Sequence, residues 1–183
     1  AKERREQGLF LVEGTHALTE AIATDYPLSI ACCTEKWIAN HPDLYAQMAE
    51  ATATIERLEI VSEEVLQAIA TTKNPDGAIA AAILPSAKNT GANPIKTLGL
   101  VLETLQDPAN IGAIIRTSVA AEIDGLLISS DSVDLTNPKI IRATAGQWFR
   151  CAMQTTGDIT AEVQSLQAQG CLLYTSPSPR DPS

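Results

Sequence analysis

Short apolar runs alternate with helical repeats along the first half of the chain. Four apolar runs predict strands, and between them apolar residues recur at the spacing of helices that bury one face. Ser62 is placed to cap the last of these helices. The alternation predicts a small α/β/α sandwich over residues 1–85. The predicted strands are Leu9–Val12, Ile30–Thr34, Arg57–Val61 and Ala78–Leu84, and the predicted helices are His16–Thr24, Asp43–Thr52 and Glu63–Ile69.

A change of composition divides the chain after this block. Residues 86–95 lie in a stretch rich in Pro, Gly, Ser and Asn that lacks apolar periodicity, so they predict a linker. The alternation restarts after the linker, and residues 96–170 therefore predict a second α/β domain. Its expected strands are Thr97–Glu103, Gly125–Ile128 and Cys151–Gln154, and its expected helices are Pro108–Ala121, Pro138–Trp148 and Ile159–Gln169.

The start of the second domain carries the most informative pattern. Gly99–Leu102 is an apolar run of the kind that a covered parallel strand uses, and a sharp turn leads from it into a helix. Asp107 is placed to cap that helix, and Pro108 suits its first turn. Asn110 lies in the first turn, near the carboxyl end of the strand, where open α/β sheets bind ligands. Arg116 lies off the apolar stripe of this helix, so its side chain is available to a ligand. The alternative interpretation is a plain strand–helix unit with a solvated arginine. The stripe consists of Ile111, Ile114, Ile115, Ser118 and Val119.

The segment Asp134–Cys151 contains a second well-specified helix start. Asn137 and Pro138 form a pair of capping residue and first-turn proline. Ala145–Gly146 permits close backbone approach by a ligand or by a packed partner. The alternative interpretation is that these residues serve only tight packing of the helix against the sheet.

The net charge of the chain limits how it could bind nucleic acid. The net charge of −9 counts against a protein whose whole surface binds nucleic acid. Two local groups of basic residues are candidates for contacts with nucleic acid, and ordinary solvated charge is the alternative for both. The first group is Lys2, Arg4 and Arg5, and the second is Lys139, Arg142 and Arg150.

The remaining composition limits the class of protein. No apolar run is long enough to span a bilayer, and Ala1–Gly8 is charged and polar, unlike a secretory signal. We therefore expect a cytoplasmic protein. The cysteines lack the paired spacing of a metal site, and we interpret them as reduced and without a catalytic role. They are Cys32, Cys33, Cys151 and Cys171.

Several of these segments resemble a known family. LQDPANIGAIIRTS and NPKIIRATAGQWFR are similar to the first two signature motifs of the SpoU/TrmH family of RNA ribose 2′-O-methyltransferases, in the SPOUT superfamily. GLFLVEGTHALTEAI and IVSEEVLQAIATTKNPDGAIAAA resemble the RNA-binding domain that precedes the catalytic domain in the rRNA-modifying members. The resemblance covers roughly residues 2–170, with the segments in the family's order.

The resemblance implies a fold and an activity. The first domain would be a small ribosomal-protein-like RNA-binding fold. The second would be a parallel-sheet SPOUT domain that binds S-adenosylmethionine and transfers its methyl group to a ribose 2′-hydroxyl of RNA, with rRNA favoured. Full-length members commonly form homodimers. The alternatives are a tRNA ribose methyltransferase, a non-catalytic RNA-binding protein and an α/β protein that binds a small molecule.

The resemblance also assigns roles to individual residues. Arg116 is at the position of the family's proposed catalytic arginine. Because a free guanidinium keeps its proton above about pH 12, we interpret Arg116 as an electrostatic clamp on the ribose or its phosphate rather than as a base. Asn110 would orient the substrate or Arg116. The RNA would contact Arg4, Arg5, Lys139, Arg142 and Arg150.

The chain departs from the family pattern at three places. Glu122 stands where the family usually has a small residue. The glycine-rich cofactor loop and the third motif, which complete the α/β knot, are not found here, so we expect this chain to lack methyl-transfer activity. Residues 171–183 are interpreted as a tail, because Cys171–Asp181, CLLYTSPSPRD, matches the translation of a transposase adapter used for sequencing libraries. We also expect the amino end to begin inside the first structural element.

Overall fold

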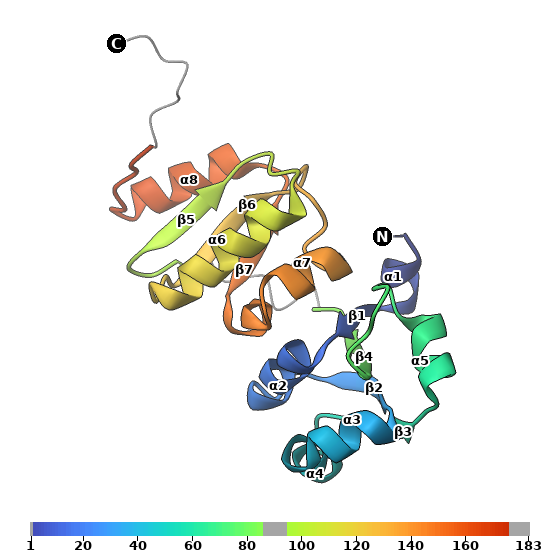
Figure 1. The fold of residues 1–183 in the computed structure, drawn as a ribbon. Helices are drawn as coiled ribbons and strands as arrows, with labels where there is room; N and C mark the ends of the chain where they lie inside the picture. The colour runs from blue at the N-terminus through green and yellow to red at the C-terminus, as the bar shows by residue number, and fades with distance from the viewer. Residues whose placement is uncertain (1, 86–94, 176–183) are drawn as a thin grey trace.

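Two β-sheets, each with its own helices, form the part of the chain that the structure describes (Figure 1). The computed structural model describes residues 2–85 and 95–175, and it describes only the backbone of Lys2, Glu3 and Arg5. The predicted linker, apart from Ile95, and residues 176–183 of the predicted tail lie outside the described residues.

The first sheet has four strands of mixed direction. Its strands are β1 (Leu9–Glu13), β2 (Leu28–Cys33), β3 (Leu58–Ile60) and β4 (Ala78–Ile83), and its helices are α1 (Lys2–Gln7), α2 (Thr15–Ala23), α3 (Glu35–Asn40), α4 (Pro42–Glu50) and α5 (Glu63–Ile69). The strand order is β1-β4-β2-β3, with β4 antiparallel to both of its neighbours and β2 parallel to β3. Helices α2 and α5 lie on opposite sides of this sheet, as a three-layered sandwich requires (Figure 1).

The four strands and three helices predicted for this half are present, with small shifts at their ends. Ser62 caps α5, as predicted, by accepting a hydrogen bond of 3.3 Å from the backbone N–H of Val65. Helices α1 and α3 were not predicted, because each has six residues and is too short to show an apolar repeat. None of the helices within 2–85 and 95–175 is long and apolar enough to cross a membrane.

The second sheet has three parallel strands in the order β5-β6-β7, which confirms the predicted parallel sheet. The elements of this half are β5 (Gly99–Leu102), α6 (Pro108–Ala120), β6 (Gly125–Ser129), α7 (Pro138–Ala143), the 3-10 helix η2 (Gln147–Arg150), β7 (Met153–Thr156) and α8 (Ile159–Ala168). Every residue of the central strand β6 is buried. The prediction that Gly99–Leu102 is covered is wrong, because β5 lies at the edge of the described sheet and its four residues are half-buried.

The predicted helix Pro138–Trp148 is interrupted, and this corrects the sequence prediction. Helix α7 ends at Ala143, because Ala145 and Gly146 adopt left-handed conformations with φ of 48° and 84°. A Cβ atom on Gly146 would lie 2.8 Å from the backbone oxygen of His16 and 2.6 Å from Cγ of Glu20. The close approach predicted for this glycine is therefore made by helix α2 of the first half, a packed partner.

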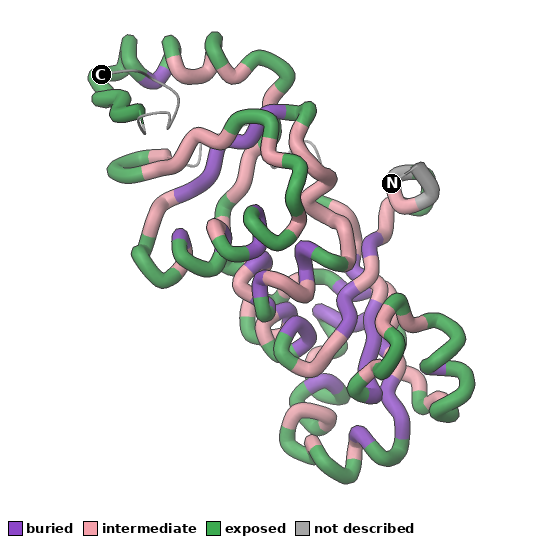
Figure 2. The backbone as a smooth tube through the Cα atoms, turned by 45° about the horizontal axis from the view of Figure 1, so that its top comes forward, coloured by how far each residue is buried: buried purple, intermediate pink, exposed green. Residues whose placement is uncertain are grey.

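A cluster of aromatic rings joins the two halves into one core. The ring of Trp148 lies 5.0 Å from that of Phe10 and 5.7 Å from that of Tyr26, and Phe149 lies 5.0 Å from Tyr26. Helix α7 packs against strand β1 beside these rings. The buried residues accordingly continue from one half into the other (Figure 2).

We predict that Gly146→Ala destabilises the protein more than Gly8→Ala. Both glycines have positive φ, but a Cβ on Gly8 would meet nothing within 4 Å, whereas one on Gly146 would collide with α2. We expect a loss of about 1 kcal/mol of unfolding free energy for Gly8→Ala and about 2–4 kcal/mol for Gly146→Ala, measured by urea unfolding. Equal losses would show that α2 does not press on this turn.

Candidate functional site

The start of helix α6 is fixed by hydrogen bonds between two loops at the carboxyl edge of the second sheet. The backbone N–H of Thr104 donates to Oγ of Ser129 at 2.8 Å, and that of Leu105 donates to Oγ of Ser132 at 3.1 Å. Asp107 accepts from the N–H of Ala109 at 2.8 Å, which confirms it as the cap. These bonds hold the amino end of α6 against the end of β6.

Asn110 and Arg116 both lie on the exposed surface of α6, but the structure does not bring them together. Six residues separate them, which corresponds to about 9 Å along the helix and about a third of a turn around it. Within the described residues neither side chain has a hydrogen-bond partner. Arg116 lies at a hollow of about 550 Å³. The hollow is lined by Ala113, Arg116, Thr117, Val119, Ala120 and Gln147.

Helix α7 lies directly against α6. A Cβ atom on Gly112 would overlap Cβ of Ala143, so this glycine allows the two helices to touch. Asn137 caps α7 by accepting from the N–H of Lys139 at 3.0 Å, as predicted. The two motif segments singled out in the sequence are therefore adjacent in space, and Arg116 follows the contact by about one turn.

Most of the predicted RNA-contacting arginines pair with carboxylates across the boundary between the two halves. The guanidinium of Arg4 donates to Asp134 at 2.7 Å, and that of Arg142 donates to Glu13 at 3.2 Å. Arg150 pairs with Glu20 of α2. Lys139 is exposed, and the side chain of Arg5 lies outside the described residues. A contact of these residues with RNA stays a prediction.

Glu13 is a buried carboxylate at the centre of these contacts. Its two oxygens accept hydrogen bonds from the backbone N–H and the hydroxyl of both Thr71 and Thr72, in the loop between α5 and β4. Burial alone would raise the pKa of Glu13, but the hydrogen bonds from Thr71 and Thr72 outweigh it and hold the pKa below the ordinary value of 4.5. Glu13 is therefore ionised at neutral pH and faces the cationic Arg142.

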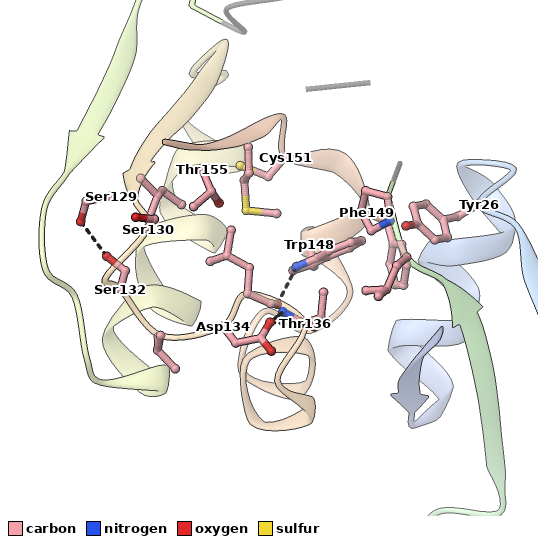
Figure 3. A pocket seen from close by; sticks show the side chains of 16 residues that line it. Tyr26, Ser129, Ser130, Ser132, Asp134, Thr136, Trp148, Phe149, Cys151 and Thr155 are labelled. Carbon is pink, nitrogen blue, oxygen red and sulfur yellow. Dashed lines mark hydrogen bonds between the residues drawn. The ribbon is translucent and has the colours of Figure 1, made fainter. Parts of the chain in front are cut away.

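A pocket of about 710 Å³ lies where the carboxyl ends of β6 and β7 face the first half (Figure 3). Tyr26, Trp148 and Phe149 form one wall, and serine and threonine hydroxyls gather at the strand ends. Burial raises the pKa of Tyr26 to about 12, so its phenol stays protonated and donates to the backbone oxygen of Ile83 at 2.9 Å. None of the lining residues belongs to α6, so this pocket does not contain Asn110 or Arg116.

Comparison with known families assigns both halves of the chain. The profile of the SpoU rRNA Methylase family matches residues 97–182, and that of the MRM3-like substrate binding domain matches residues 1–80. The chain belongs to the SpoU methyltransferase family. The SpoU profile extends over most of the segment that we interpreted as a tail, and that interpretation stays a prediction.

Curated relatives of this SpoU protein align along nearly the whole chain. An uncharacterised tRNA/rRNA methyltransferase of Synechocystis is 36% identical over 173 residues, which are 94% of this chain and 61% of the relative. The 23S rRNA (guanosine(2553)-2′-O)-methyltransferase RlmP of Bacillus subtilis is 25% identical, over 94% of this chain and 64% of the relative. The chain thus spans less than two thirds of the length of these relatives.

Solved structures share the fold. The SpoU methyltransferase AviRb of Streptomyces viridochromogenes matches 93% of this chain and 63% of its own with a TM-score of 0.72 at 20% identity. The AdoMet-bound rRNA methyltransferase of Sinorhizobium meliloti matches 91% of this chain and 60% of its own with a TM-score of 0.71 at 22% identity. At these identities the likeness establishes the fold alone.

The surroundings of Arg116 do not fit a methyl donor by themselves. Adenosine needs an enclosed, largely apolar site, and a sulfonium is favoured by a carboxylate or an aromatic face. The hollow at Arg116 is lined by three small apolar side chains, Thr117 and Gln147, without an aromatic ring or a carboxylate. The described residues around Arg116 therefore do not form a complete site for S-adenosylmethionine.

Sequence reasoning missed Glu13, Thr71 and Gln147. A signal for Glu13 was available, because an acidic residue ends the apolar run of β1 and a buried carboxylate needs partners. No signal was available for the partners, since Thr71 and Arg142 are 71 residues apart in sequence. Glu122, which stands where the family usually has a small residue, adopts a left-handed conformation with φ of 55°.

We predict that Glu13→Gln lowers stability at neutral pH and that the difference from the unchanged protein shrinks in acid. The pKa of Glu13 is lower in the folded state, so its contribution is present above about pH 4.5 and is lost as the pH falls through the folded value. We expect a loss of about 1–3 kcal/mol at pH 7, from urea unfolding at a series of pH values. Glu59→Gln, which changes an exposed carboxylate, is the control. A loss that stays the same from pH 7 to pH 3 would contradict this account.

Proposed function

We propose that this SpoU protein takes part in the S-adenosylmethionine-dependent methylation of a ribose 2′-hydroxyl in RNA, and that ribosomal RNA is the substrate. The support is the order of the two family matches: a substrate-binding domain precedes a SpoU domain, and the relative in Bacillus subtilis is named as a 23S rRNA 2′-O-methyltransferase. The Synechocystis relative is named for both tRNA and rRNA, so a tRNA substrate is the second candidate.

The single structural observation that carries this proposal is that Arg116 is exposed and unpaired. Its guanidinium is exposed and without a partner among the described residues, although most other arginines of this half are paired with carboxylates. A solvated arginine beside a hollow is available to an incoming anion. We assign Arg116 to the phosphate or to the ribose oxygen of the RNA, where its planar set of donors stabilises negative charge.

Asn110 has a separate role in this proposal. Because about 9 Å and a third of a turn separate it from Arg116, its amide is assigned to the substrate rather than to the orientation of Arg116. A ribose hydroxyl is a weak nucleophile, so holding it in line with the methyl group contributes much of the rate. The methyl donor in this proposal is S-adenosylmethionine, which is named as bound to the Sinorhizobium meliloti protein.

The 183-residue chain is predicted to bind S-adenosylmethionine weakly and to transfer no methyl group. The reason is that a donor held within reach of Arg116 would meet neither an aromatic ring nor a carboxylate among the described residues of the hollow there. Isothermal titration calorimetry with the chain and the donor tests this, and stoichiometric binding at micromolar donor would overturn it.

The role of Arg116 in methyl transfer is tested in a fusion protein. Residues 1–170 are joined to the segment of the Synechocystis relative that follows the matched region, and transfer from radiolabelled donor to rRNA and to tRNA is measured separately. We predict that Arg116→Ala lowers turnover by about 100-fold or more while the melting temperature is unchanged, because the side chain is exposed and unpaired.

Arg57→Ala is the matched control, since Arg57 is an exposed arginine of the first half whose guanidinium pairs with Glu59. Turnover of Arg116→Ala at the rate of this control would remove Arg116 from the mechanism. Methylation of tRNA but not of rRNA would select the second candidate.

A further inference from the structure

Arg142 belongs to the second half of the chain but is held by the first. Its Nη1 donates to Glu13 at 3.2 Å and to Oγ1 of Thr71 at 2.7 Å. The hydroxyl of Thr71 in turn donates to Glu13 at 2.6 Å. The guanidinium, the carboxylate and the hydroxyl thus form a closed triangle of hydrogen bonds across the boundary, which fixes the orientation of the guanidinium plane.

Only one nitrogen of that guanidinium takes part in the triangle. Within the described residues Nε and Nη2 have no partner, and the side chain of Arg142 is 29% exposed whereas that of Glu13 is 3% exposed. The carboxylate lies in the interior while part of the guanidinium reaches the surface. A pair with this geometry presents unused N–H groups to solvent in a fixed direction.

Two further cations belong to the same region. Lys139 lies three residues before Arg142 on α7, which places it on a neighbouring turn, and it is exposed. Lys73 is exposed and lies two residues after Thr71 in the loop between α5 and β4. The carboxylate of Asp76, in the same loop, is engaged by the N–H and the hydroxyl of Thr15 at 2.7 and 2.8 Å.

We propose that Arg142, Lys139 and Lys73 form a phosphate-binding site for the RNA backbone that spans both domains, and that Glu13 and Thr71 are its positioning residues. This rests on the proposed function, since it names where that RNA is held. A planar guanidinium with two free donors suits a phosphate oxygen pair, and lysines add positive charge around it. Because α7 touches α6, a strand held here passes next to the helix that carries Arg116.

The proposed role of Glu13 predicts the direction in which Glu13→Gln changes the affinity for RNA. Glu13→Gln removes a negative charge, and simple electrostatics therefore predicts tighter binding of RNA. If Glu13 holds Arg142 in place, the same change frees the guanidinium and weakens binding. The direction of the change separates the two accounts.

The test measures binding of a fluorescein-labelled RNA hairpin to the 183-residue chain by anisotropy, over about 50 to 200 mM salt. We expect Arg142→Ala to weaken binding about tenfold and to reduce the slope of log K against log salt by about one. Lys73→Ala and Lys139→Ala each reduce the slope by a similar amount. Glu13→Gln and Thr71→Val weaken binding about threefold to tenfold, although neither removes a positive charge.

The controls are Arg57→Ala and Glu59→Gln, which remove the same charges at the far edge of the first sheet. All measurements are made well below the melting temperature of each variant. Two results would overturn this inference and leave the proposed function standing. One is an affinity of Arg142→Ala for RNA equal to that of Arg57→Ala. The other is an affinity that Glu13→Gln increases, as Glu59→Gln does. Failure of the unchanged chain to bind any RNA at low salt would overturn both.

Discussion

The structure depends on the docking of one short segment, α7 with the turn that follows it, between the two sheets. On one side α7 packs against β1, where the buried Glu13 meets Arg142. On the other side it touches α6 at Gly112. The rings of Trp148 and Phe149 extend the same segment into the first half. A carboxylate as deeply buried as Glu13 would be costly alone. The first half supplies its hydrogen bonds from Thr71 and Thr72, and the ion pair with Arg142 requires the second half to be present and aligned.

This docking explains how a protein with a net charge of −9 can belong to a family that acts on RNA. Its basic residues are few, and several are neutralised by carboxylates at the boundary. The cations that remain exposed, such as Lys139 and Arg116, belong to helices that this boundary holds in place. Binding of an anion would then rely on local arrangement rather than on the overall field of the protein.

The sequence predicted the elements well where short-range rules decide them. Asp107, Asn137 and Ser62 cap the helices that their positions indicated, because a capping bond spans only two or three residues. The long helix Pro138–Trp148 was wrong for the opposite reason: apolar periodicity continues through Ala145 and Gly146, but contact with α2 selects a left-handed turn there. The prediction that β5 is covered was wrong for a similar reason, since the position of a strand within a sheet depends on all other strands. Asn110 and Arg116 could be singled out from their motif, whereas Glu13 and Thr71 become part of a site only through the fold.

The three ion pairs at the boundary have one more consequence. Arg4 pairs with Asp134, Glu13 with Arg142 and Glu20 with Arg150, at sequence separations of 130, 129 and 130 residues. Two stretches of chain therefore run alongside each other in the same direction, in nearly constant register. During synthesis at about 5–20 residues per second, the first stretch waits on the order of ten seconds for its partner to be made. For that interval Glu13 has no cation opposite it, and Phe10 of β1 lacks the Trp148 ring that packs against it. Chaperone contact and misassociation with a second nascent chain would be concentrated at β1, in a window that closes when residue 150 emerges from the ribosome.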